Sequence, residues 1–435
     1  MTYVETQKIG DATNPALIAA VTGSSPTPSA SGLVTRNVDM SFDAFNRLRV
    51  SSPYNQFAGF NEYIINPFNY VTYVVGTGSV THSATTKMTT ISTGGTASGA
   101  RAVLQSRLYF RYVPGKSLFP MITFVMGSTP PTNAAKRAMY GDDRNGVGLE
   151  WTSGGVRFFK RSDTTGSIVT TNIEQASWNV DPLNGTGPSG LTLDLTKGQI
   201  FWVDLQFLGM GTVRIGFEIN GIQYLCHQLH HSNLTATQPY MATANLPVRW
   251  EVVNTGVASG AATMECCCAK VDSEGGFEVP GIQYNASRGA VGMGTTTTLK
   301  PLVSIRPGPT FGGITNRGWI VPRVAKLLTV GTSNHYWELI WNATLTGPSW
   351  TAVNTNAMGQ YDVTATAVSL GSGVVVDSGY VAPASGSGSD VGETFSGRPL
   401  VNSFDGTTPD TLTLAVRTIS GTDDAYGSIS WLGYW

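Results

Sequence analysis

Residues 212–226 read TVRIGFEINGIQYLC, and this stretch determines the fold class of the chain. The apolar side chains at positions 213, 215, 217 and 219 alternate with polar or small residues, which is the period of a strand with one buried face. Asn220-Gly221 follows at once, and both residue types tolerate the positive φ of a type I′ turn. The run after the turn is again rich in strand formers, so the stretch predicts a β-hairpin.

Similar short runs lie on both sides of this hairpin. They occupy residues 103–112, 156–161, 246–253 and 262–269, and residues 199–208 (QIFWVDLQFL) are typical of a central strand. After Gly275-Gly276, further runs occupy 326–330, 335–341, 411–419 and 429–435, whereas 382–390 has the composition of a long exposed loop. Many short strands joined by Gly and Asn turns are typical of a sandwich or jelly roll.

We therefore predict an all-β chain with four parts. An extended N-terminal arm covers residues 1–57, and a concanavalin-like or jelly-roll-like β-sandwich covers 58–280. A linker at 281–298 leads to a second, C-terminal β-domain at 299–435. The length itself predicts about two or three domains, because 435 residues exceed what one hydrophobic core usually organises.

The composition favours some classes of protein function and disfavours others. Charged residues make up only 13% of the chain, about half the usual share, which is typical of a surface covered by other subunits. A net charge of −1 disfavours a dedicated nucleic-acid binder, and no apolar run reaches the roughly 20 residues of a membrane helix. No secretory signal is seen at the start, so we expect a protein that stays in the cytoplasm or leaves it inside a particle.

Motif searches give only weak candidates for chemistry. Residues 185–190 (GTGPSG) match a dinucleotide-binding pattern, but Pro188 and a strand-like continuation favour a turn. Cys226, His227, His230 and His231 include zinc-ligand types, but their spacing fits no known zinc pattern. The consecutive Cys266, Cys267 and Cys268 favour reduced, partly buried thiols, because neighbours on a strand point to opposite faces.

Catalysis is the weaker reading, and we predict no enzyme, no cofactor and no metal. Neither a nucleophile motif nor the strand-borne carboxylate pair of lectin-like glycosidases is present. A sugar site stays open as an alternative, since exposed aromatic and polar side chains would serve it. The candidate types are Trp151, Trp178, Asn179, Asp181 and Trp202, although Trp178 and Trp202 are better explained as core residues.

Residues 42–57 read FDAFNRLRVSSPYNQF and resemble an N-terminal segment of tailed-bacteriophage virion proteins, approximately FDAFGRLRVS-PY-LF. Asn46 stands where that pattern has Gly. The motifs between 178 and 249, among them 185–190 and 245–249 (NLPVR), are similar to the core of the same group. The resemblance covers about the first two-thirds of the chain and implies a virion component with a lectin-like or jelly-roll-like body.

The resulting hypothesis is a structural protein of a phage virion, assembled in the bacterial cytoplasm as a trimer or dimer. We expect it to decorate the capsid as a head fibre or cement protein, with the major capsid protein as partner. A tail or baseplate appendage that binds host glycan is the alternative, and a polysaccharide-degrading enzyme is the third. Docking is expected through aromatic and arginine anchors. These anchors are Phe42, Phe45, Arg47, Arg49, Tyr54 and Phe57.

Overall fold

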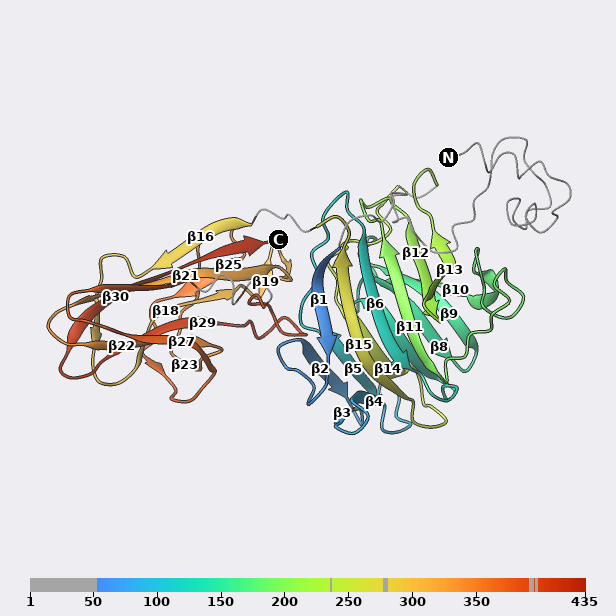
Figure 1. Ribbon diagram of the computed structural model, residues 1–435, viewed down its shortest axis with the longest axis horizontal. Helices are drawn as coiled ribbons and strands as arrows, with labels where there is room; N and C mark the ends of the chain where they lie inside the picture. Colours follow the sequence, from blue (N-terminus) through green and yellow to red (C-terminus); the bar gives the residue numbers. More distant parts are fainter. Residues whose placement is uncertain (1–52, 235–236, 277–280, 391–394, 396–397) are drawn as a thin grey trace, which may run out of the picture.

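The structure is a computed structural model, and it describes residues 53–234, 237–276, 281–390, 395 and 398–435. Figure 1 shows two β-domains side by side, the first on the right and the second on the left. In the described ranges the regular elements are strands, apart from a 3₁₀ turn at Gln175–Ser177. No helix in these ranges is long and apolar enough to cross a membrane. The all-β prediction is confirmed.

The first domain is a sandwich of two antiparallel sheets. One sheet has eight strands in the order β13-β12-β11-β6-β15-β4-β3, with β1 also paired to β15. Its strands are β1 (Tyr54–Phe60), β3 (Ser79–Ser83), β4 (Met88–Ser92), β6 (Leu118–Val125), β11 (Gly198–Leu205), β12 (Val213–Ile219), β13 (Ile222–Leu229) and β15 (Thr263–Ser273). The predicted β-sandwich body is therefore confirmed.

The second sheet of the sandwich has seven strands in the order β10-β9-β8-β7-β14-β5-β2. They are β2 (Tyr70–Val75), β5 (Arg101–Ser106), β7 (Ala134–Gly141), β8 (Gly146–Thr152), β9 (Gly155–Ser162), β10 (Val169–Glu174) and β14 (Val248–Asn254). The inward side chains of both sheets form one core, as alternation requires. In it Phe158 stacks on Trp178 with ring centroids 3.9 Å apart.

The hairpin predicted at 212–226 is present as β12 and β13. Asn220 (φ 55°) and Gly221 (φ 78°) form its turn, and Ile219 pairs with Ile222 directly across it. The 199–208 run forms β11, which lies between β12 and β6 and is central as predicted. Residues 185–190 lie in turns and an isolated bridge region, which confirms that the Gly-rich motif is not a strand-to-helix nucleotide loop.

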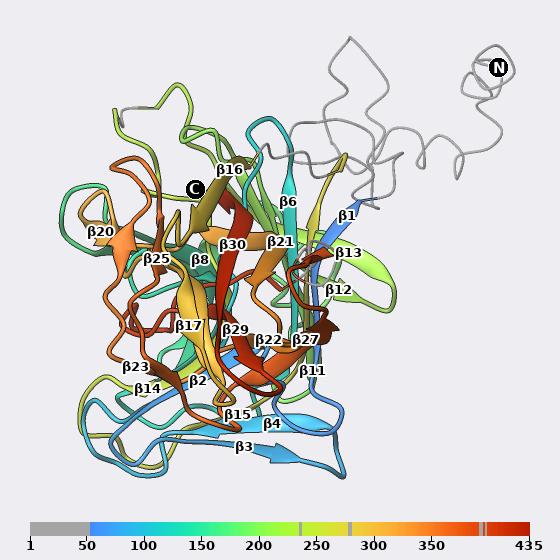
Figure 2. The same cartoon turned by 90° about the vertical axis from the view of Figure 1, so that its left-hand side faces the viewer.

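The second domain also packs sheets around its own core. One sheet holds β16 (Ile282–Ser287), β17 (Met293–Thr295), β21 (Trp319–Val330), β28 (Gly386–Asp390) and β30 (Asp423–Tyr434). The facing sheet holds β18 (Lys300–Pro307), β22 (His335–Trp341), β24 (Thr351–Ala352), β25 (Gly359–Asp362), β27 (Val374–Val381) and β29 (Leu412–Thr418). Two small ribbons pair β19 (Thr310–Phe311) with β20 (Ile314–Thr315) and β23 (Leu345–Thr346) with β26 (Ala367–Val368). Figure 2 views the molecule from this domain's side.

Three predicted boundaries are wrong. The linker expected at 281–298 holds β16 and β17, which both pair with β30. The loop expected at 382–390 ends in β28, which pairs with β21. Backbone ladders need no large side chains, so these Gly- and Ser-rich runs pair despite their turn-like composition. The arm was expected to end at residue 57, but β1 already joins the first sheet from Tyr54.

The two domains contact each other through charged and aromatic side chains. The Arg107 guanidinium lies 2.6 Å from the carboxylate of Asp410, which is 3% exposed. Phe404 of the second domain stacks on Tyr73 with centroids 4.5 Å apart. Arg317 lies 4.5 Å from the centroid of the Tyr109 ring. These contacts join the domains along the β2 and β5 side of the first sandwich.

Candidate functional site

The six predicted docking residues fall into two groups. Phe42, Phe45, Arg47 and Arg49 lie outside the described residues. Tyr54 and Phe57 lie on β1, where Tyr54 is 47% exposed and Phe57 only 6% exposed.

The ring of Phe57 packs inside the first domain. Its centroid lies 5.6 Å from that of Tyr70 and 5.1 Å from that of Phe110. Phe57 is therefore a core residue, and its assignment as a docking anchor is wrong. Alternation along β1 turns this side chain inward, and the sequence alone did not reveal that β1 joins the sheet.

A row of charged side chains lies on the seven-stranded sheet, on the face turned away from the core. Five side chains of alternating sign stand directly opposite one another on neighbouring strands. In order from β10 to β14 they are Glu174, Arg157, Glu150, Arg137 and Glu251, which we call the charge row. Cross-strand partners of opposite sign attract each other at this short range.

Arg137 is the centre of the charge row. Its Nε lies 2.5 Å from Glu150 Oε2, and its NH1 lies 2.5 Å from Glu251 Oε1. Glu150 also accepts a hydrogen bond from Arg157 Nε at 2.7 Å. Glu251 accepts another from Arg101 NH2 at 2.7 Å. A single guanidinium thus bridges two carboxylates that are 5% and 2% exposed.

The electrostatics of the charge row favour ionised carboxylates. Burial removes water from Glu150 and Glu251 and by itself opposes ionisation. The nearby arginines, Arg137 foremost, outweigh that desolvation, so the pKa of both carboxyls lies below the usual range. A glycosidase acid needs a raised pKa to hold a proton at neutral pH, and neither carboxyl provides one.

The second domain closes one end of this face. The Phe404 ring lies 5.2 Å from the guanidinium carbon of Arg249, whose NH1 bonds Asp143 at 2.6 Å. The space left between the domains near Gln105 and Asn402 is only about 10 Å³. This hollow has room for no more than about one water molecule.

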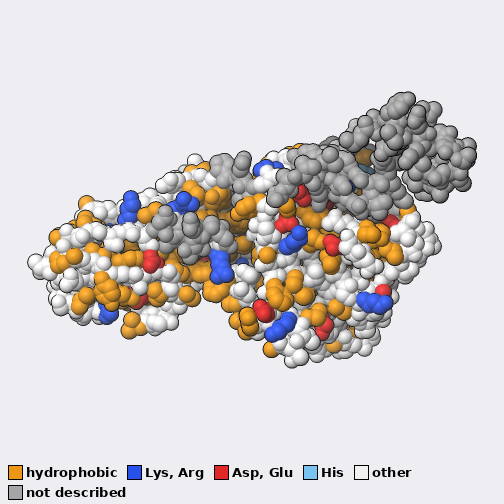
Figure 3. Space-filling view, in the orientation of Figure 1, with side chains coloured by type: hydrophobic (Ala, Val, Ile, Leu, Met, Phe, Trp, Pro, Cys, Tyr) orange, Lys and Arg blue, Asp and Glu red, His pale blue; other side chains and the backbone are white. Residues whose placement is uncertain are grey.

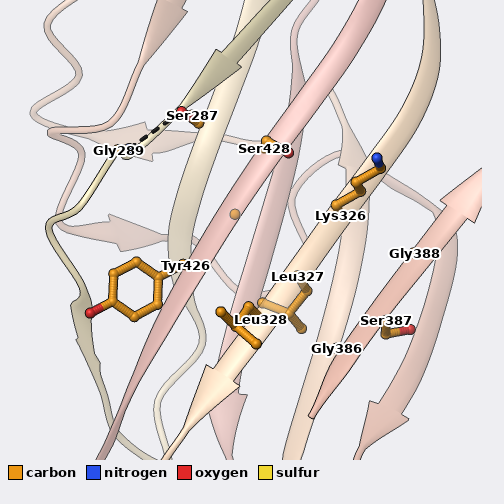
Figure 4. Close-up of a pocket in the computed structure, with 11 residues that line it drawn as sticks. Ser287, Gly289, Lys326, Leu327, Leu328, Gly386, Ser387, Gly388, Tyr426 and Ser428 are labelled. Carbon is orange, nitrogen blue, oxygen red and sulfur yellow. Dashed lines mark hydrogen bonds between the residues drawn. The ribbon is translucent and has the colours of Figure 1, made fainter. Parts of the chain in front are cut away.

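A larger hollow lies on the second domain, in the outer surface of the sheet that contains β21, β28 and β30. Its volume is about 580 Å³, within the range of ligand pockets. Figure 4 shows Tyr426 and the pair Lys326 and Leu328 along neighbouring strands, with Ser287 and Ser428 beside them. We call this hollow the second-domain groove.

Glycines keep the second-domain groove open. Gly386 and Gly388 of β28 pair with Leu328 and Lys326, which face the groove, and carry no side chain that would fill it. The groove combines an aromatic ring, several hydroxyls and one ammonium group. Sequence reasoning missed it because 386–390 was read as loop, and only the pairing of β28 with β21 brings its parts together.

The predicted metal candidates do not converge. Cys226 is buried in the sandwich core. His227 Nδ1 accepts a hydrogen bond from the backbone N of Asn179 at 3.1 Å. His231 Nε2 lies 2.6 Å from the carbonyl oxygen of Gln238. Within the described ranges no three His, Cys, Asp or Glu side chains form a metal-binding group, and all four cysteines are free thiols.

The side chains considered for a sugar site are mostly internal. Trp178 is 4% exposed and Trp202 is 0% exposed, which confirms that both are buried. Asp181 is also buried, where it accepts hydrogen bonds from the backbone of Leu183 and Ser189. These residues therefore do not form an exposed platform for a sugar.

Comparisons with known proteins give structural likeness only. No family model and no curated protein matches the chain. A legume lectin-like domain from Entamoeba histolytica shares 11% identity over 53% of this chain and 100% of its own, with a TM-score of 0.29. Lectin I-B4 from Griffonia simplicifolia, in its metal-free form, shares 11% over 51% and 99%, with a TM-score of 0.29. A glycoside hydrolase family protein from Mycobacterium thermorestibile shares 11% over 50% and 99%, with a TM-score of 0.33. At such values the likeness concerns the β-sandwich fold alone.

Proposed function

We propose that this chain is a non-catalytic structural protein of a tailed-bacteriophage virion, joined to the particle through the segment before β1. Its preferred place is the capsid surface, as a decoration, head-fibre or cement protein that contacts the major capsid protein. A short tail or baseplate appendage is the alternative place. The proposal starts from the resemblance of residues 42–57 to a segment of phage virion proteins.

The attachment of β1 is the observation that carries the proposal. Tyr54–Phe60 pairs along β15 from Ser273 to Cys268, and Phe57 is fixed in the core. The first described strand is therefore an integral part of the sheet, and the segment before Tyr54 continues directly from it. This suits a protein whose N-terminal segment holds its body on a larger assembly.

The surface also supports a place among other subunits. Figure 3 shows charged side chains that are few and widely spaced, with polar and apolar surface between them. Large apolar side chains are exposed on both domains. They include Tyr63 (75%), Val257 (72%), Ile314 (73%), Leu370 (84%) and Tyr380 (75%). Contacts with neighbouring subunits are one way to cover such a surface.

The charge row supports the non-catalytic part of the proposal. In it two buried acidic side chains and several arginines lie together on one face of the sandwich. Because its carboxyls have lowered pKa values and are held by arginines, the row stabilises the sheet and does not supply an acid–base pair.

Deleting residues 2–52 tests the proposal. The cut stops before β1, so the truncated chain keeps every described strand and should keep its thermal midpoint. Either the full chain or the truncated chain is supplied while phage particles assemble. Only the full chain should then copurify with the particles. Equal incorporation of both forms would refute docking through the N-terminal segment.

Glycan binding is a second candidate function, favoured by the second-domain groove. Tyr426 offers an aromatic ring and the serines offer hydroxyls, which are the group types that saccharides contact. A screen of bacterial surface saccharides should find a ligand that Tyr426→Ala loses. Tyr380→Ala, which removes a 75% exposed tyrosine outside the groove, is the matched control and should bind normally. Equal binding by both variants would exclude the groove.

A further inference from the structure

The three consecutive cysteines lie on β15, which runs between β1 and β6 in Figure 1. The ladder with β6 is regular up to Cys266 and resumes at Ala269. The two residues in between, Cys267 and Cys268, therefore stand opposite the single residue Thr123. Two residues facing one across an antiparallel pair form a β-bulge.

The bulge turns both cysteines to the same face of the sheet. Before it, the even-numbered residues 264 and 266 point into the core, and after it the odd-numbered residues 269 and 271 do. Because side chains alternate along a strand, Cys267 and Cys268 at this change of phase both point outward. The expectation from the sequence, that adjacent cysteines face opposite sides, is therefore wrong for this pair.

The bulge also brings the two sulfurs together. Cys267 Sγ lies 3.4 Å from Cys268 Sγ, and both side chains are half-buried. The Thr123 hydroxyl fixes the bulge, because it accepts from the backbone N of Cys268 at 2.7 Å and donates to the carbonyl oxygen of Cys268 at 3.0 Å. The other two thiols are separate from this pair, since Cys226 and Cys266 are 0% and 1% exposed in the core.

We propose that Cys267 and Cys268 form a redox-active dithiol, which small disulfide compounds oxidise to a disulfide between adjacent residues. A disulfide needs two sulfurs on the same side of the backbone, and a regular strand does not offer them on neighbouring residues. The bulge removes that obstacle. This modification site depends neither on the virion proposal nor on the second-domain groove.

An apolar hollow beside the pair indicates which disulfides reach it. The hollow has a volume of about 380 Å³, and Cys268 lines it together with Phe60 and Met121. Phe60 stands opposite Cys268 across the β1 ladder and is 46% exposed. Lys270 at the hollow is paired with Asp272 at 2.8 Å. A neutral aromatic disulfide can place one ring in this hollow as it meets the sulfurs.

The oxidation proceeds by thiol–disulfide exchange in two steps. The Cys267 thiolate attacks one sulfur of the small disulfide, whose S–S bond breaks and releases one thiolate. The Cys268 thiolate then attacks the Cys267 sulfur of this mixed disulfide, and the second thiolate leaves. Two electrons pass from the pair to the reagent, and the two cysteine protons pass through water to the two released thiols.

The order of the steps follows from the surroundings of Cys268. Burial and then the adjacent Cys267 sulfur raise the pKa of the Cys268 thiol, so Cys268 keeps its proton beside a Cys267 thiolate. We therefore assign the first attack to Cys267, since only a thiolate attacks. In the mixed disulfide the Cys267 sulfur is neutral, and its charge no longer opposes ionisation of Cys268.

The disulfide formed in this way should be easy to reduce. A trans peptide holds adjacent Cα atoms about 3.8 Å apart, less than the roughly 4.4–6.8 Å usual across a disulfide. Strained disulfides are the labile ones, so we expect reduced glutathione in excess to reopen the bond. The pair is then a reversible modification site and not a permanent crosslink.

Titration of the folded full chain with dithiodipyridine, a neutral aromatic disulfide, tests the proposal. Each exchange step releases one thiopyridone, which absorbance counts. The wild type should release two thiopyridones per chain and keep no adduct, so that its intact mass falls by two hydrogen atoms. Excess reduced glutathione should restore the original mass. A chain that keeps a thiopyridyl adduct, or that releases no thiopyridone, would overturn the proposal.

Single variants identify the two sulfurs. Cys267→Ser and Cys268→Ser should each release at most one thiopyridone and keep the other half of the reagent as a mixed disulfide. Cys266→Ala is the matched control, because it removes the neighbouring thiol on the core face, and it should still release two. Thermal midpoints of the unreacted variants show whether they fold.

Mass spectrometry of the oxidised wild type gives the same assignment without any substitution. The peptide that contains all three cysteines should carry a bond between Cys267 and Cys268 and a free thiol at Cys266. A bond to Cys266 in that peptide, or loss of closure in a folded Cys266→Ala variant, would overturn the proposal.

Discussion

Replacing Glu251 by Gln should destabilise the first domain severely. The change keeps the size of the side chain but removes the charge that Arg137 and Arg101 face at 2.5 and 2.7 Å. Arg249 NH1, 3.4 Å away, loses it as well. Breaking a buried pair from one side costs about 3–5 kcal/mol, because the remaining charges stay buried without a partner. For a domain of this size the melting midpoint should fall by roughly 6–20 °C.

The matched control is Glu174→Gln, at the exposed end of the same charge row. Its side chain is 57% exposed and 3.4 Å from Arg157, so its loss should cost less than about 1 kcal/mol. Calorimetry of the full chain measures both variants. A loss below about 1 kcal/mol for Glu251→Gln would refute the view that the charge row is a tightly coupled buried network.

The pH dependence follows from the lowered pKa of Glu251. A carboxyl whose folded pKa lies below its unfolded value of about 4.3 adds stability above that value. This stability is lost as the pH falls from there toward the folded pKa. The difference in stability between wild type and Glu251→Gln should therefore be full at neutral pH and shrink in acid.

Two other changes test the first sandwich. Phe57→Ala should lower the free energy of unfolding in urea by about 3–5 kcal/mol, because it empties a core site. The control Tyr63→Ala, at a 75% exposed side chain, should lower it by less than about 1 kcal/mol. Similar losses for the two variants would refute the core placement of β1. Gly221→Ala should cost about 1 kcal/mol because of its φ of +78° and not because of space, since no atom lies within 4 Å of the added Cβ. Gly198→Ala has equal space and no positive φ, so calorimetry should show no loss there, and equal effects at both glycines would contradict the type I′ turn.

The sequence predicts those parts of the fold that local patterns determine. Alternation at 213–219 and the Asn220-Gly221 turn were sufficient for β12 and β13. Strands with small or polar side chains were missed, because β16 (IQYNAS) and β28 (GSGSD) are recognisable only by the partner strands they pair with. Phe57 was misassigned for the same reason, since its burial follows from the pairing of β1 with β15, more than 200 residues away.

The charge row could not be predicted from the sequence, although the sequence contains isolated charged residues at its positions. Arg137 and Glu150 each stand at an outward position of a strand whose other face is apolar. Such isolated charges usually indicate a solvated face. They form one row only because the register of β14 beside β7 places Glu251 opposite Arg137. These two residues are separated by 114 positions in the sequence. The second-domain groove likewise exists only once β28 has paired.

The most direct test of the central claim is a cryo-electron microscopy map of intact particles of the source phage. We expect density for both β-domains on the particle surface, with the chain before Tyr54 running from the end of β1 onto a neighbouring virion protein. Density on the capsid lattice would establish the decorating role, and density on the tail would establish the appendage. Particles that lack this chain altogether would contradict the proposed function.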